Sequence, residues 1–170
     1  MQFQIGDQVV HPVHGVGTIT TFSTQRFVGA IARHYYEVTH PRATVWVPVD
    51  EKGQTVLRGI ASKGSLKGCR KMLKGAPVPL SKNRQLRQNA IAHHLAGRSL
   101  LSLCRIVRDL RAESHQKPLG SIEGELLHKT FQAVCDEWAA SAGVTSQFAL
   151  TEIESLLLRT SPSQPPAIKS

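Results

Sequence analysis

The first residues whose types could do chemistry are His11 and His14, two histidines near the N-terminus on either side of Pro12 and Val13. A close histidine pair can begin a transition-metal site when a third ligand joins it. Pro12 excludes helical geometry for the pair, and the sequence does not indicate the third ligand that a strand would require. We therefore interpret both as turn histidines, and an enzyme built on them and Asp7 is a minor alternative.

Other signatures of catalysis are missing from the sequence. Gly15 and Gly17 follow one predicted strand and precede another, so they indicate a bend in the sheet and no phosphate loop. There is no nucleophile elbow, Walker loop or pair of catalytic carboxylates. Glu123 and Glu125 suit the first turn of a helix, where acids stabilise the dipole. The sequence predicts a protein that is not an enzyme and needs no metal or cofactor.

The cysteine content indicates an intracellular protein. Cys69, Cys104 and Cys135 are odd in number and widely spaced, which is typical of reduced packing residues rather than of a disulfide framework or zinc site. No run approaches the roughly eighteen apolar residues of a membrane span. The N-terminus also lacks the pattern of a signal peptide, so we expect a cytoplasmic protein without membrane attachment.

Positive charge is concentrated in one segment of the chain. Residues 61–120 contain thirteen Lys or Arg and two acids, Asp109 and Glu113, whereas the first sixty residues are nearly neutral and the last fifty are acidic. Lys and Arg bind polyanions by displacing counterions from phosphates. If this positive charge served only solubility, it would have no reason to be absent from the segments before and after residues 61–120. We therefore expect the middle of the chain to bind nucleic acid.

The first sixty residues have the pattern of a small β structure. Alternating or β-branched runs at 8–11, 16–22, 34–38, 44–47 and 55–58 are separated by turn residues. Short strands at this spacing predict an antiparallel barrel. Trp46 and Phe27 are expected in its core or in a protein interface.

From residue 61 the periodicity becomes helical. Helices are predicted at 62–74, from a cap at Ser81 to Ala96, from a cap at Ser99 to Ser114, from Ser121 to a stop at Gly143, and from a cap at Thr145 or Ser146 onward. The fold class is therefore segregated α+β, with a β domain at 1–60 and a helical domain at 61–160. Residues 161–170 are expected to be a disordered tail.

Basic side chains on two of these helices are the candidate nucleic-acid contacts. Helical spacing predicts two outward stripes that could follow a duplex backbone, although two solvated faces would have the same pattern. The candidates are Lys82, Arg84, Arg87 and Gln88 on the first helix and Arg98, Arg105 and Arg108 on the second.

The opening segment, residues 5–17 (IGDQVVHPVHGVG), resembles the CarD family of bacterial RNA-polymerase-binding transcription regulators. The resemblance continues, in order, through 35–38 (YYEV), 45–49 (VWVPV), 56–58 (VLR), 95–97 (LAG) and 106–110 (IVRDL). It implies a Tudor-like barrel, shared with transcription-repair coupling factor, that binds the polymerase β subunit. It also implies a helical domain that binds duplex promoter DNA beside the transcription bubble, largely independently of sequence, and stabilises the open complex.

The family's polymerase-contacting strands match residues 24–27 and 44–48. The resemblance thus assigns polymerase binding to Gln25, Arg26, Val45, Trp46 and Pro48. It implies a protein associated with the nucleoid through polymerase, and we expect a monomer in solution. An RNA- or ribosome-associated protein is the alternative that fits the composition equally well.

The main departure from the family pattern is the loss of a Trp. A gapless match from Pro79 to Leu110 places Arg84 where the family has a Trp that wedges into the minor groove. Arginine can enter a narrow minor groove, but it does not fill the space beside an unstacked base step. Leu80 or Leu86 would take the wedge position if the helix were shifted.

Overall fold

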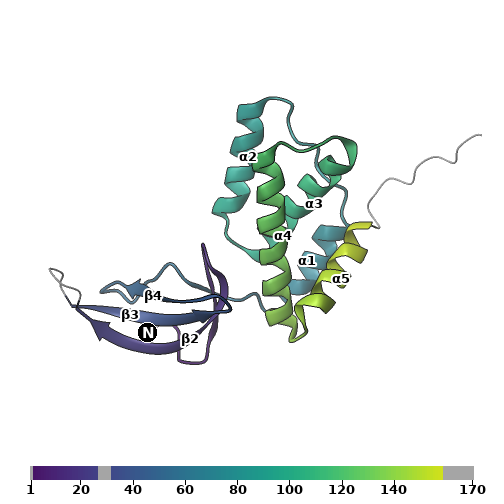
Figure 1. The fold of residues 1–170 in the computed structure, drawn as a ribbon. Helices are drawn as coiled ribbons and strands as arrows, with labels where there is room; N and C mark the ends of the chain where they lie inside the picture. The colour runs from purple at the N-terminus through teal and green to yellow at the C-terminus, as the bar shows by residue number, and fades with distance from the viewer. Residues whose placement is uncertain (1, 27–31, 159–170) are drawn as a thin grey trace, which may run out of the picture.

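The computed structural model describes residues 2–26 and 32–158, and within them five strands precede five helices (Figure 1). This arrangement confirms the segregated α+β class. The strands are β1 (Gln8–His11), β2 (Gly15–Gln25), β3 (Arg33–His40), β4 (Ala43–Val49) and β5 (Arg58–Gly59). Phe27 and the expected tail at 161–170 lie outside the described residues.

The strands form one antiparallel sheet in the order β4-β3-β2-β1-β5. Its inner face buries a cluster consisting of Val9, Ile19, Tyr36, Val38, Val47, Val49 and Leu57. The close packing of the sheet explains the glycine at position 17, because a Cβ there would lie 2.7 Å from both the His40 ring and the Val38 side chain. β2 extends three residues past the predicted strand, and the last strand begins later than predicted, at Arg58.

The helices are α1 (Ser65–Lys74), α2 (Arg84–Ala96), α3 (Leu100–Gln116), α4 (Ser121–Ala142) and α5 (Ser146–Leu158). The Ser99 hydroxyl accepts from Ser102 N–H, which confirms that cap, and the Thr145 hydroxyl accepts from Phe148 N–H. The predicted Ser81 cap is wrong, because the Asn83 side chain accepts from the first free N–H groups of α2. Ser81 lies two residues earlier and accepts from Asn83 N–H.

Helix α3 lies at the centre of the helical bundle, in contact with α1, α2 and α4, while α5 packs on α1 and α4. Trp138 is fully buried, and its indole N–H donates to Glu152 over 2.9 Å. Cys69, Cys104 and Cys135 are free and buried in the same cluster, consistent with the packing role expected for them.

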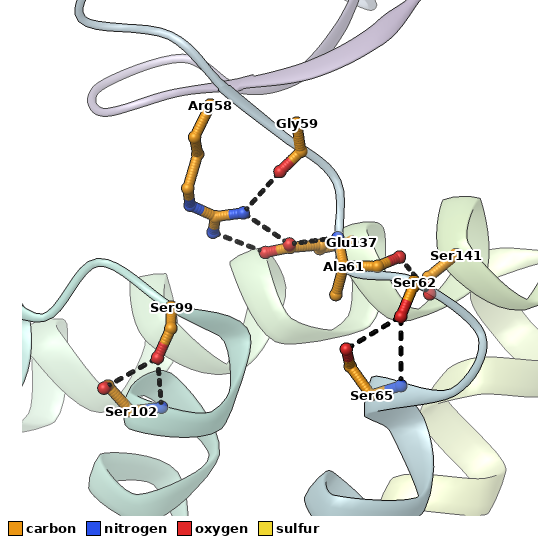
Figure 2. A network of polar contacts seen from close by, with 9 residues as sticks. All are labelled: Arg58, Gly59, Ala61, Ser62, Ser65, Ser99, Ser102, Glu137 and Ser141. Atoms are coloured by element: carbon orange, nitrogen blue, oxygen red, sulfur yellow. Dashed lines mark hydrogen bonds and ion pairs between the residues drawn. The ribbon is translucent and has the colours of Figure 1, made fainter.

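The segment between the sheet and the bundle is held by polar contacts to α4 (Figure 2). The Arg58 guanidinium binds the Glu137 carboxylate, which also accepts from Ala61 N–H. The Ser141 hydroxyl donates to Ala61 O over 2.6 Å. Arg98, between α2 and α3, donates to Val56 O over 2.9 Å. Both ends of this connecting segment are therefore fixed to the bundle.

Candidate protein-binding and nucleic-acid-binding surfaces

The outer face of the sheet brings three of the predicted polymerase-binding residues together. Side chains alternate along β3 and β4, so that Tyr36 and Val47 point inward while their neighbours point outward. In the strand register Trp46 lies opposite Glu37, Pro48 opposite Tyr35, and Tyr35 opposite Ser23. Gln25, Trp46 and Pro48 consequently share one face, and Trp46 is 50% exposed.

The two other predicted residues are placed differently. Val45 points to the inner face, where it lies opposite Val38 and packs on the sheet core. Its side chain is therefore not part of the face that Gln25, Trp46 and Pro48 share. Arg26 is exposed directly after the end of β2.

Sequence reasoning missed two residues of the outer face. Tyr35 lies between Ser23 and Pro48 in the register, and Arg33 lies opposite Gln25. The two-residue period of β3 contained the signal, because it places both on the face opposite Tyr36. Aromatic and arginine side chains are enriched at protein interfaces, so the outer face has the composition of a protein-binding surface.

The beginning of α2 presents a polar and basic surface. Lys82 precedes the helix, Arg84 is its first residue, and Gln88 follows one turn later; all three are exposed. Leu86 is 59% exposed, whereas Leu80 is half-buried. Four side chains that the sequence analysis proposed for DNA contact, those of Lys82, Arg84, Leu86 and Gln88, are thus accessible to a partner.

Arg87 is a correction to the candidate set, because its side chain is buried. It is 8% exposed and donates to Glu113 over 2.9 Å and to both oxygens of Glu123. Hydrogen bonds to Glu123 and, with a smaller effect, to Glu113 raise the pKa of Arg87. These contacts join α2 to α3 and α4, so Arg87 supports the bundle and is not available to a phosphate.

Arg108 is a second correction. It is 7% exposed, donates to Asp109 over 2.8 Å and contacts Met72 at the end of α1. Asp109 also accepts from Val78 N–H over 2.9 Å. The physical reason is that the end of α1 covers α3 at this position, so Arg108 is closed to solvent although it has the spacing of an outward residue.

Arg98 and Arg105 remain accessible on the second stripe. Arg98 is exposed, has φ 45° and is bonded to Val56 O, while Arg105 is half-exposed. Helix α1 adds a basic stripe absent from the candidate set. Its exposed members are Lys67, Lys71 and Lys74, and Lys63 lies just before the helix. Their spacing of three and four residues was the signal that could have found them.

A third histidine lies beside the N-terminal pair. The rings of His11, His14 and His40 have centroids 4.8 to 6.0 Å apart. His40 is buried and its Nδ1 bonds Val16 O over 3.0 Å. Within the described ranges 2–26 and 32–158, no group of three His, Cys, Asp or Glu side chains is arranged to hold a metal ion.

Among the described residues no helix is long and apolar enough to cross a bilayer. The comparisons with known proteins concern both parts of the chain. The family model of the CarD-like/TRCF RID domain matches residues 3–61, which contain the whole sheet. A protein of Bacillus subtilis (strain 168), named "Putative transcription factor YdeB", is 21% identical over 146 residues. That alignment covers 85% of this chain and 95% of the relative.

A domain of the matched kind implies interaction with RNA polymerase in general. The resemblance to the CarD family predicted from the sequence is confirmed at the N-terminus, where the sheet module of this chain matches the family model of the CarD-like/TRCF RID domain.

Proposed function

We propose that this chain is a non-catalytic, CarD-like transcription regulator that binds the RNA polymerase β subunit and upstream promoter DNA and modulates the stability of the open complex. The observation that carries the proposal is the pairing of a CarD-like/TRCF RID domain at 3–61 with a positive charge confined to 61–120. One module, at 1–60, binds protein, and the other, at 61–160, binds phosphates.

Polymerase binds the outer face of the sheet, through Gln25, Trp46 and Pro48, with Arg26 at its end. Trp46 is half-exposed and shares its face with Tyr35, which lies opposite Pro48. An aromatic side chain in this setting supplies a large apolar contact that a protein partner desolvates. This recruits the protein to promoters, which places it in the cytoplasm on the nucleoid.

Duplex DNA binds exposed side chains at the start of α2 and in the segment that precedes it. Lys82 precedes the helix and Arg84 is its first residue. Gln88 lies one turn beyond Arg84 on the same side. Contacts of this type fix position on the backbone without reading bases, so binding is largely independent of sequence. Arg84 occupies the position of the family's wedge Trp, and therefore the protein clamps DNA without wedging open a base step.

Purified polymerase and promoter DNA test both contacts. We expect Trp46→Ala and Arg26→Glu to weaken polymerase binding by the full-length chain, and Val13→Ala, at an exposed site in the β1–β2 turn, to leave it unchanged. Lys82→Ala and Arg84→Ala should each lower the salt slope of duplex affinity by about 0.9. Binding of structured RNA or ribosomes in preference to both partners would overturn the proposal.

A further inference from the structure

A cavity of about 360 Å³ lies where α2 ends and α3 begins. Its lining comes from the last turn of α2, the connecting turn and the first turns of α3. The residues are His93, His94, Ala96, Gly97, Leu101, Ser102 and Arg105. This cavity is separate from the exposed start of α2, which lies at the opposite end of that helix.

The lining contains cationic or protonatable side chains and no carboxylate. Burial lowers the pKa of His94, and the nearby charges of Arg105, His93 and Arg108 lower it further, whereas Asp109 opposes them. Asp109 is already bound to Arg108 and to Val78 N–H. The positive groups of the cavity therefore crowd one another without a neutralising partner in its wall.

The turn at Gly97 lies close against Ser102, another residue of the cavity lining. A Cβ at Gly97 would lie 2.8 Å from the Ser102 hydroxyl oxygen, so a side chain here would displace Ser102. Ser102 and Ser99 hydroxyls lie 2.8 Å apart (Figure 2). Arg98 has a positive φ of 45°, which is strained for a residue with a Cβ, and its bond to Val56 O supports it. Backbone strain of this kind is concentrated at functional sites.

We propose that this cavity binds a phosphate group through the Arg105 guanidinium, the Ser102 hydroxyl and the protonated His94 imidazole. Guanidinium and hydroxyl donors match phosphate oxygens, and a dianionic or diester phosphate neutralises the crowded positive groups. If the phosphate belongs to a duplex backbone, the inference rests on the proposed function. If it is a free phosphate, the cavity is an independent anion site.

Binding at this cavity takes up a proton. His94 is neutral near pH 7.5 because its pKa is lowered, and a phosphate beside it favours the imidazolium form. The affinity for a phosphodiester, whose own charge does not change in this range, therefore increases as the pH falls. We expect duplex binding at this cavity to be roughly tenfold tighter at pH 5.5 than at pH 7.5.

Histidine NMR titrations of the full-length chain test the proposal, with inorganic phosphate in one arm and a short DNA duplex in the other. The expected result is that the pKa of His94 rises in at least one arm. Arg105→Gln and His94→Gln should weaken that binding, and His94→Gln should abolish its pH dependence. The control Arg42→Gln removes one charge from the exposed β3–β4 turn and should change neither.

Each outcome decides the question. A rise with the duplex alone assigns the cavity to a nucleic-acid backbone, and a rise with inorganic phosphate assigns it to free phosphate. An unchanged His94 pKa in both arms overturns the proposal, even if the duplex binds elsewhere and the proposed function stands. Conversely, a response to inorganic phosphate without duplex binding retains the cavity while refuting the DNA role. Circular dichroism of each variant confirms that it is folded.

Discussion

Arg58 and Glu137 are 79 residues apart in sequence and form a two-point ion pair, with N–O distances of 2.5 and 2.7 Å. Glu137 is 1% exposed, and the same carboxylate accepts from Ala61 N–H over 3.0 Å. Three donors from the connecting segment thus converge on one side chain of α4. The pair fixes the direction in which the chain leaves the sheet and enters the bundle.

Replacing Glu137 by Gln should destabilise the protein and loosen the junction. The substitution leaves Arg58 without its counter-charge. Breaking a buried ion pair costs about 3 kcal/mol at the low end of the observed range. We expect this low value because Arg58 is 26% exposed. Urea unfolding measures this loss. Glu154→Gln, at an exposed position of α5, is the control and should change the unfolding free energy by less than about 0.5 kcal/mol. Equal effects of both variants would contradict the role of the junction.

Replacing Arg87 by Ala should reduce stability rather than act on DNA directly. Its removal leaves Glu113 and Glu123 without their buried partner, at a cost of about 3 kcal/mol. The matched variant is Arg84→Ala, three residues earlier and exposed, which should weaken duplex binding without changing the unfolding free energy. Both quantities are measured on both proteins. If Arg87→Ala keeps the parental stability and loses duplex affinity, Arg87 is a DNA contact.

Replacing Arg84 by Trp should lengthen the lifetime of the open complex. An indole stacks on an exposed base step, and about 1 kcal/mol of stacking corresponds to roughly a fivefold longer lifetime. Polymerase affinity should not change, because that contact is on the sheet. The measurement is the decay of promoter complexes after a competitor is added, with Lys129→Trp on α4 as control. An unchanged lifetime, together with loss of the parental effect in Leu86→Ala, would make Leu86 the wedge.

The histidine cluster should make stability depend on pH. Burial, then the charges of His14, His40 and Arg98, holds the pKa of His11 below its ordinary 6.5. The unfolded chain therefore binds more protons, so stability is full above about pH 6.5 and falls as the pH decreases below it. His11→Asn should flatten this loss, since the Asn oxygen can replace Nδ1 as acceptor for the N–H groups of Val13 and His14.

Urea unfolding at pH 7.5 and 5.5 measures the effect. His115→Asn, at the exposed end of α3, serves as the control. A residual slope from His94, whose pKa is also lowered, is expected in the variant. The cluster would have no such role if His11→Asn and the parent lost stability equally between the two pH values.

Local patterns predicted the elements well because each depends on neighbouring residues. Strand alternation and the cap at Ser99 could be found from spacing alone. The choice of Asn83 over Ser81 as cap could not, since both are suitable residues and the path of the preceding loop decides between them.

The candidate sites were predicted less completely because exposure depends on tertiary packing. Arg87 and Arg108 have the same helical spacing as solvent-facing arginines, yet Glu113, Glu123 and Asp109 meet them inside the bundle. Glu113 and Glu123 are distant from Arg87 in sequence, and Asp109 is adjacent to Arg108. No sequence pattern identifies these carboxylates as partners of the two arginines. His40 joined the N-terminal histidines in the same way, through the pairing of β3 with β2.

The buried cysteines give the helical module an intrinsic reporter of its own opening. Burial raises the pKa of Cys135 to about 11, and a hydrogen bond with Cys69, followed by burial, raises the pKa of Cys104. Both thiols are therefore protonated and shielded from reagents in the folded state. A reagent can therefore alkylate these thiols only after the bundle opens. Its rate, followed by mass spectrometry on the native chain, measures the free energy of that opening in the absence of denaturant, and it can be repeated with polymerase or DNA bound.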